Sequence, residues 1–170
     1  MDIRKNTFKA NLQTDKIQYG IWNGIPDGYV AEILGGSGFD FVLIDSEHGP
    51  FDLPSVIHQL QALGQFPVTP IVRPPNGDPV IIKQLLDGGV QTLLVPMIET
   101  AEQAELMSRA MRYPPAGIRG VGTALARASQ WNRVNNYFRD ADGEMCLILQ
   151  VESVAGYEAL DKILEVEGVD

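Results

Sequence analysis

The sequence has little of what disulfides and zinc sites require. Its 170 residues include one cysteine, Cys146, and two histidines. A single cysteine excludes an intrachain disulfide and fits a reducing compartment. Cys146 stands inside the apolar run MCLILQV, so we expect a small buried side chain rather than a catalytic thiol. Because the chain lacks a Cys/His ligand set for zinc, a bound metal is expected to be a hard cation held by oxygen atoms.

Positive charge and long apolar runs are also scarce. The chain has 13 lysines and arginines against 22 acidic residues, which gives a net charge of −9. No Lys/Arg cluster exceeds two residues, and this argues against a nucleic-acid partner. No apolar stretch reaches the roughly 18 residues of a membrane span, and the charged N-terminus lacks the apolar region of a secretory signal. These absences predict a cytoplasmic protein without membrane partners, in which individual arginines are candidates for binding anionic substrates.

Strand-like and helical patterns alternate along the chain at a period of roughly 25 residues. Continuously apolar runs predict strands at 17–24, 39–47, 69–75, 90–98 and 144–153. Helical patterns occupy 26–38, 52–64, 78–89, 100–114 and 154–168. Asp52 and Thr100 are typical helix N-caps, and Gln103 follows Thr100 at the spacing of a capping box. The stretch 115–133 is less regular, and its glycines indicate a short strand or tight loop before a polar helix or loop.

Strands that are apolar throughout favour a parallel sheet covered by helices, either doubly wound or closed as a (β/α)8 barrel. The first strand is followed by NGIPDG and not by the G-x-G-x-x-G of a dinucleotide fold. Residues able to contact a substrate instead follow the C-terminal ends of the strands: Trp22, Asn23, Asp45 to His48, Arg73, Gln150 and Glu152. In a barrel these ends face one rim, where barrel enzymes carry their sites. We therefore predict an α/β fold of the (β/α)8 TIM-barrel type.

The length of the chain predicts that this barrel is incomplete. A complete barrel takes about 200 to 250 residues, whereas residues 1–170 provide about six strand-helix units, with 115–133 as the weak fifth. The chain stops as a seventh strand, EGVD, would begin, and a barrel ending there would leave sheet edges uncovered. We expect a single barrel domain over 1–170 that is truncated at its C-terminus, with a smaller open sheet as the alternative.

Gln150 and Glu152 are candidates for a metal and substrate site. Side chains alternate along a strand, so residues 150 and 152 should point the same way. A carboxylate on the inner face of a parallel sheet is costly unless it is paired or binds a metal. Glu152 is therefore predicted either to bind Mg²⁺ or Mn²⁺ or to pair with an arginine inside the protein.

Arg73, Asp45 and His48 are candidates for the chemistry itself. Two prolines follow Arg73 and fix where its guanidinium points, which suits a clamp for a carboxylate or an enolate oxygen. Asp45 stands three residues before His48 and is expected to orient the imidazole for general acid–base work. The alternatives are a structural salt bridge for Arg73 and a surface loop position for His48. Together these residues indicate metal-assisted chemistry on a small oxo-acid.

Several segments carry a family resemblance. They are LIDSEHGP, PIVRPP, IKQLLDGGVQTLLVPMIETAEQAE, RYPPAGIRGVGTALARASQWNR and LILQVES. In this order they resemble the HpcH/HpaI aldolase family of metal-dependent, class II pyruvate aldolases, and the similarity runs from Phe8 to Asp170. The segment 114–133 looks most like members that cleave 4-hydroxy-2-oxoheptanedioate to pyruvate and succinate semialdehyde. Members acting on 2-keto-3-deoxy sugar acids of the rhamnonate or glucarate type are similar.

The resemblance implies a (β/α)8 barrel assembled as a homohexamer, a trimer of dimers. It implies that Glu152 binds Mg²⁺, Mn²⁺ or Co²⁺ with Gln150 beside it, and that Arg73 binds the pyruvate oxygens. It further implies that His48, oriented by Asp45, handles the proton of the aldol hydroxyl, and that Trp22 lines the substrate pocket. A second carboxylate ligand is expected beyond Asp170. The alternatives are a non-catalytic barrel fragment that binds oxo-acids, and a citrate-lyase-like subunit, for which no coenzyme A or phosphate site is evident.

Overall fold

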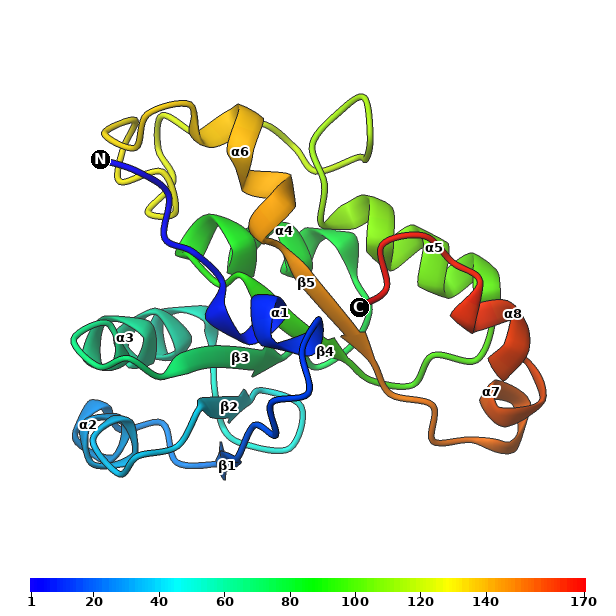
Figure 1. Ribbon diagram of the computed structural model, residues 1–170, viewed down its shortest axis with the longest axis horizontal. Coiled ribbons are helices and arrows are strands. Elements are labelled where there is room, and N and C mark those ends of the chain that lie inside the picture. The colour runs from blue at the N-terminus through cyan, green and yellow to red at the C-terminus, as the bar shows by residue number, and fades with distance from the viewer.

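A computed structural model describes residues 1–170 and contains one sheet of five parallel strands (Figure 1). The strands are β1 Gly20–Asn23, β2 Phe41–Asp45, β3 Thr69–Arg73, β4 Thr92–Val95 and β5 Cys146–Leu149. They lie side by side in chain order, and every neighbouring pair is parallel. The helices are α1 Thr7–Leu12, α2 Gly28–Gly35, α3 Leu53–Leu63, α4 Pro79–Gly88, α5 Ala101–Ala110, α6 Tyr137–Glu144, α7 Val154–Glu158 and α8 Leu160–Leu164. None of these helices combines the length and the apolar character needed to span a membrane.

The five regular strand predictions are confirmed, and of the two alternatives for 115–133 the loop holds, which corrects the count of six strand-helix units. Residues 115–133 form turns and loop without a strand, so the chain contains five strands rather than six. Many of their backbone bonds are local, such as Ala126 N–H to the Thr123 carbonyl at 3.2 Å and Trp131 N–H to the Ala126 carbonyl at 3.1 Å. A segment whose backbone N–H and C=O groups bond within turns has few of them left to pair with a neighbouring strand.

The helix starts confirm the capping predictions. The Asp52 side chain accepts the Ser55 N–H, and Thr100 and Gln103 form both halves of a capping box. The helix predicted over 154–168 is divided at Ala159 into α7 and α8, and α1 and α6 were not predicted. Both unpredicted helices are short, and neither carries the long apolar periodicity that identifies a helix in a sequence.

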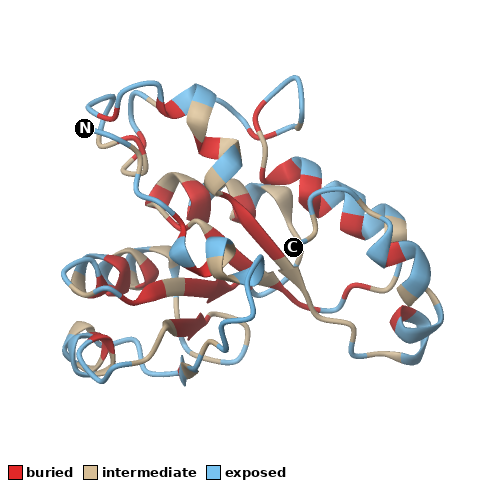
Figure 2. Cartoon of the chain, viewed as in Figure 1, coloured by how far each residue is buried: buried red, intermediate tan, exposed pale blue.

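The two faces of the sheet bury different side chains because neighbouring residues of a strand point in opposite directions. One face, with Val42, Ile44, Val72, Leu93 and Leu147, belongs to a cluster of 22 buried residues shared with the helices. Figure 2 shows how largely the central strands are buried. The other face carries Leu43, Ile71 and Cys146, which pack with Phe8 of α1. This second face corresponds to the inside of a barrel, and its line of side chains continues to Asp45 on β2 and Arg73 on β3.

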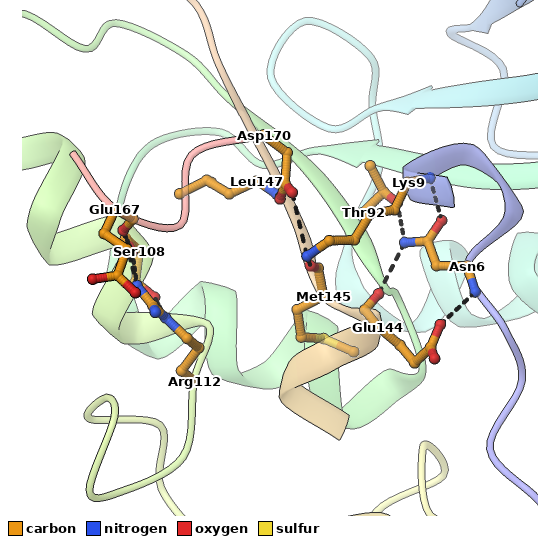
Figure 3. A network of polar contacts seen from close by, with 10 residues as sticks. All are labelled: Asn6, Lys9, Thr92, Ser108, Arg112, Glu144, Met145, Leu147, Glu167 and Asp170. Carbon is orange, nitrogen blue, oxygen red and sulfur yellow. Dashed lines mark hydrogen bonds and ion pairs between the residues drawn. The ribbon is translucent and has the colours of Figure 1, made fainter. Parts of the chain in front are cut away.

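The helix α1 and its cap Asn6 contact the N-terminal ends of β3, β4 and β5, and Figure 3 shows the contacts to Thr92 and Met145. The Asn6 side chain donates to Thr92 Oγ1 at 2.9 Å and to the Glu144 carbonyl at 2.9 Å, while its Oδ1 accepts the Lys9 N–H at 3.0 Å. Thr92 is the first residue of β4. Asp170 lies beside β5, where its backbone N–H donates to the Leu147 carbonyl at 2.9 Å. These contacts occupy one end of the sheet, and the polar side chains of Asp45 and Arg73 gather at the other.

We predict that Asn6→Ala lowers the free energy of unfolding by about 2 kcal/mol, because it removes a helix cap and leaves buried polar groups without partners. Urea denaturation measures the change. Asn135→Ala is the matched control, since Asn135 is exposed and its side chain makes no hydrogen bond. Equal losses in the two variants would contradict the anchoring role of Asn6.

Candidate active site

A buried ion pair between Arg73 and Asp45 forms the centre of the candidate site. The two residues end β3 and β2 and are direct partners in the strand register. Arg73 Nε donates to Asp45 Oδ1 at 2.8 Å, and Arg73 Nη2 donates to Asp45 Oδ2 at 2.7 Å. Both residues are buried. The geometry is the bidentate fork that guanidinium and carboxylate groups form, so the orientation of Arg73 is fixed about two of its nitrogen atoms.

The same contacts keep Asp45 ionised. Burial by itself raises the pKa of Asp45, but the hydrogen bonds from Arg73 and from the backbone N–H groups of His48 and Glu47 outweigh it. The net result is a pKa below the ordinary value for an aspartate. The pKa of Arg73 is raised, above all by its hydrogen bonds to Asp45. The pair is therefore charged on both sides at neutral pH.

The remaining edge of the Arg73 guanidinium faces Glu47 and Gln150. Arg73 Nη1 lies 2.9 Å from Glu47 Oε2 and 3.3 Å from Gln150 Oε1. The first contact is an ion pair without good hydrogen-bond geometry, because Glu47 Oε2 has no hydrogen-bond partner. The Trp22 ring, half exposed, lies under the guanidinium with its centroid 4.6 Å from Arg73 Cζ. The structure thus brings Trp22, Asp45, Arg73 and Gln150 together as predicted.

Glu47 is a site residue to which the sequence patterns assigned no role, although it stands among the polar residues that follow β2. Its side chain turns back to Arg73 because the chain bends sharply after β2, where the Gly49 N–H donates to the Asp45 carbonyl at 3.0 Å. A Cβ atom at Gly49 would lie 2.4 Å from that carbonyl oxygen, so this bend requires glycine. In the sequence, the glycine that follows Ser46-Glu47-His48 is the signal that indicates a sharp turn here.

The predicted contact between Asp45 and the His48 imidazole is wrong. Arg73 occupies both Asp45 oxygens, and the only group of His48 that donates to Asp45 is its backbone N–H, at 3.3 Å. The His48 side chain is 75% exposed, and its Nε2 lies 3.7 Å from Glu47 Oε2. Glu47 is therefore the carboxylate nearest to this imidazole, and it stands between His48 and Arg73.

Glu152 and Gln150 point the same way, as predicted. Gln150 Nε2 lies 3.4 Å from Glu152 Oε2, and the Met97 backbone N–H donates to Glu152 Oε1 at 3.0 Å. Glu152 is exposed rather than buried, and it forms no ion pair with an arginine or lysine, so the predicted alternative of a buried salt bridge is excluded. Met97 is held at φ 56°, a left-handed conformation that a side chain disfavours, and this aims its N–H at the carboxylate.

These donors fit part of a hard-cation site. A carboxylate that forms no ion pair with a basic side chain is the ligand type that Mg²⁺ and Mn²⁺ prefer, and the side-chain amide of Gln150 lies beside it. No group of three His, Cys, Asp or Glu residues that could hold a metal ion converges in residues 1–170, so these donors form at most part of a cation site.

The single cysteine is placed as the sequence predicts. Cys146 is fully buried on the inner face of the sheet with Leu43 and Ile71. Burial raises the pKa of its thiol to about 12. A thiol in this state does not form the thiolate that nucleophilic chemistry requires.

Comparison with known proteins assigns the family. The family model described as HpcH/HpaI aldolase/citrate lyase matches residues 18–170. This chain belongs to that family. Two relatives named hydroxypyruvate/pyruvate aldolase, from Deinococcus radiodurans and Pseudomonas aeruginosa, are 58% and 55% identical over the whole chain. A relative from Klebsiella pneumoniae, named 4-hydroxy-2-oxo-heptane-1,7-dioate aldolase, is 54% identical over 97% of the chain. The chain spans 61%, 63% and 62% of the lengths of these three relatives.

Solved structures of the family confirm the fold class. An HpcH/HpaI aldolase/citrate lyase family protein from Burkholderia cenocepacia J2315 superposes with a TM-score of 0.95 at 35% identity, over 98% of this chain and 67% of that one. A structure described as citrate synthase SbnG gives a TM-score of 0.83 at 31% identity, over 95% of this chain and 62% of that one. The five-stranded parallel sheet is therefore part of the (β/α)8 barrel of the HpcH/HpaI family, and Arg73 lies at the C-terminal end of its strand β3.

The lowered pKa of Asp45 leads to a prediction about stability and pH. The charged form of Asp45 stabilises the fold above its unfolded pKa of about 3.9, and this contribution is lost as the pH falls through the lower folded pKa. We predict that Asp45→Asn lowers the free energy of unfolding by about 2 kcal/mol at pH 7. The loss is smaller than for a buried arginine left without any carboxylate, because Glu47 stays beside Arg73.

Urea unfolding of wild type and Asp45→Asn between pH 7 and pH 3 tests this prediction. The difference between the two proteins should shrink as the pH falls below about 4. Asp161→Asn, at an exposed carboxylate without an ion pair, is the control and should show no such trend. A difference for Asp45→Asn that stays constant across this pH range would contradict the assignment.

Proposed function

We propose that this HpcH/HpaI protein is a divalent-cation-dependent pyruvate aldolase. It reversibly cleaves a 4-hydroxy-2-oxo acid to pyruvate and an aldehyde through a pyruvate enolate. The leading substrate is 4-hydroxy-2-oxoheptanedioate, which yields succinate semialdehyde as the aldehyde. The observation that carries the proposal is the chain of contacts from the fixed Arg73 guanidinium to Glu152. Arg73 Nη1 donates to the Gln150 side-chain oxygen, and the Gln150 side-chain nitrogen lies next to the Glu152 carboxylate.

Arg73 is proposed to bind the pyruvate part of the substrate. Asp45 holds Nε and Nη2, so Nη1 is the edge left for a substrate oxygen. The contacts that substrate would replace there are those to Glu47 and Gln150, which are longer or less well aligned than the pair with Asp45. A guanidinium held in this way stabilises the negative charge that develops on the enolate oxygen, at no reorganisation cost during the reaction.

His48 is proposed to move the proton of the 4-hydroxyl group. Its imidazole is exposed and stands next to Glu47, so it is free to meet a substrate bound at Nη1 of Arg73. Glu47, rather than Asp45, is the group placed to orient this imidazole. Removal of the hydroxyl proton allows the C3–C4 bond to break, and the reverse step returns it during aldol addition.

Glu152, with Gln150 beside it, is proposed to hold the divalent cation, with Mg²⁺, Mn²⁺ and Co²⁺ as candidates. When bound, such a cation supplies Lewis-acid stabilisation to the oxygen atoms of an oxo-acid. The Met97 N–H keeps one Glu152 oxygen in place, and the Gln150 amide neighbours the other.

Other members of the family define the alternatives. The relatives named hydroxypyruvate/pyruvate aldolase make hydroxypyruvate a second candidate substrate for the site. Sugar-acid substrates of the 2-keto-3-deoxy type and a binding-only role for oxo-acids are further candidates. The neighbour described as a citrate synthase shows that the fold hosts other reactions. We favour an aldolase because the aldolase-named relatives are 53–58% identical, whereas this neighbour is 31% identical.

The assembly and location expected from the sequence stay predictions. A homohexamer, a cytoplasmic location and the absence of nucleic-acid partners belong to this proposal. So does the expectation that residues 1–170 are one incomplete barrel domain.

We predict that EDTA abolishes aldehyde release from 4-hydroxy-2-oxoheptanedioate by the full-length protein, and that Mg²⁺, Mn²⁺ or Co²⁺ restores it. The site contains no lysine for a Schiff base, and Lys83 lies in α4, so borohydride with pyruvate should leave activity intact. Pyruvate release coupled to lactate dehydrogenase is the readout. Inactivation by borohydride together with resistance to EDTA would refute the metal-dependent mechanism. Pyruvate binding without any cleavage would support the binding-only role.

We predict that Arg73→Lys lowers kcat/KM for aldol cleavage by about 10²-fold or more, because an ammonium group cannot keep two bonds to Asp45 while presenting an aligned donor to substrate. The same coupled assay measures the loss. His58→Ala is the matched control, since His58 is exposed on α3 and contacts no site residue. Activity of Arg73→Lys within a factor of two of wild type would show that the guanidinium geometry is not required.

A further inference from the structure

Two arginines meet at the end of the sheet opposite Arg73. Arg4, before α1, and Arg127, in the loop before α6, line a cavity of about 120 Å³. The cavity also contacts Gln91, Gln130 and Tyr137, and none of its lining residues is acidic. Figure 1 shows the N-terminal segment running beside the loop that precedes α6, and the Asn135 N–H joins the two by donating to the Met1 carbonyl at 2.8 Å.

The two guanidinium groups have no counter-ion. Neither Arg4 nor Arg127 forms an ion pair, although the chain contains 22 acidic residues against 13 basic ones. The nearby carboxylate of Asp87 is taken by Arg119, at 2.8 Å from its Nη2. Burial, and next the charge of Arg4, lower the pKa of Arg127. Two like charges are therefore held close together without compensation, which costs free energy unless an anion joins them.

Backbone contacts hold both side chains in place. Arg4 Nη2 donates to the Val68 carbonyl at 3.3 Å, and Arg127 Nη1 donates to the Gly88 carbonyl at 2.9 Å. Gln91 Nε2 donates to the Arg4 carbonyl at 2.7 Å and fixes the backbone there. The contact with Gly88 is a favourable one for a cation at the C-terminal end of α4. It uses one of the five N–H groups of Arg127, so most donors of both arginines remain without a protein acceptor.

We propose that this cavity is a binding site for a small tetrahedral oxyanion of the phosphate class, bridged by Arg4 and Arg127. The guanidinium fork matches the oxygens of phosphate, and the volume admits one such group but not a nucleotide. Binding would join the N-terminal segment, the end of α4 and the loop before α6, and would thereby stabilise the folded state. The site is separate from the oxo-acid site, because Pro70 lines the cavity near the start of β3 whereas Arg73 ends that strand.

Inorganic phosphate is the probe, titrated into the purified full-length protein while its melting temperature and heat of binding are followed. We expect a saturable rise in melting temperature with phosphate and none with chloride at equal ionic strength. Arg4→Gln should weaken phosphate binding about tenfold or more, because a charge-assisted contact is lost. Arg4 is exposed and makes one long hydrogen bond through its side chain, so this variant should fold. Arg127→Lys provides a second variant that keeps the charge but loses the fork.

Two further variants make the test specific. Arg109→Gln removes an exposed arginine of α5 outside the cavity and should bind phosphate like wild type. Arg73→Gln should also keep the response, because the proposed site does not include Arg73. Phosphate that bound at the oxo-acid site instead would lose its binding in this variant. A response that survives in Arg4→Gln, or one that disappears only in Arg73→Gln, would overturn the proposal. So would the absence of any phosphate response, which would leave the arginines as partners of backbone carbonyls alone.

Discussion

The candidate site depends on one buried ion pair, Arg73 with Asp45. Two charges removed from water are costly, and the cost is repaid only when the geometry is good and the remaining donors are satisfied. Here the pair is bidentate, and the third nitrogen of Arg73 meets Glu47 and Gln150 while Trp22 covers one face of the guanidinium. Arg73 therefore organises side chains from β1, β2, β3 and the end of β5. The positions of Glu47 and Gln150 follow from where this guanidinium stands.

The alternation of side chains along parallel strands explains why the pair stands there. Residues 41, 43 and 45 of β2 share one face with 69, 71 and 73 of β3, so the apolar lining of the inner face ends in charges at one edge of the sheet. The opposite edge is closed by α1 through Asn6 and Thr92. Because the helix covers the N-terminal ends of the strands, the polar side chains gather at their C-terminal ends. Barrel enzymes generally carry their sites at that end.

Much of this arrangement could be predicted from the sequence because it depends on periodicity. Apolar runs of about five residues, each followed by polar residues, located β1 to β5 and placed Arg73, Gln150 and Glu152 at one edge. What could not be predicted depends on side-chain competition and turn geometry. Asp45 and His48 have suitable spacing, but Arg73 takes both oxygens of Asp45, and the bend at Gly49 brings Glu47 to the guanidinium instead. For the stretch 115–133 the sequence left a short strand and a loop open, and the structure has the loop, because glycine-rich patterns do not distinguish those two outcomes.

The three nitrogen atoms of Arg73 make contacts of unequal strength, and this affects how a substrate could bind there. Asp45 binds two nitrogens through short, aligned hydrogen bonds, whereas the third nitrogen faces a poorly aligned carboxylate and an amide at 3.3 Å. An incoming carboxylate or oxo group therefore competes only with the weak contacts, and the strong pair keeps the guanidinium from rotating during that exchange. Releasing Gln150 frees its amide beside Glu152, and releasing Glu47 frees a carboxylate beside His48. Occupation of a single nitrogen of Arg73 is in this way linked to both the proposed cation-binding residue Glu152 and the proposed proton-handling residue His48.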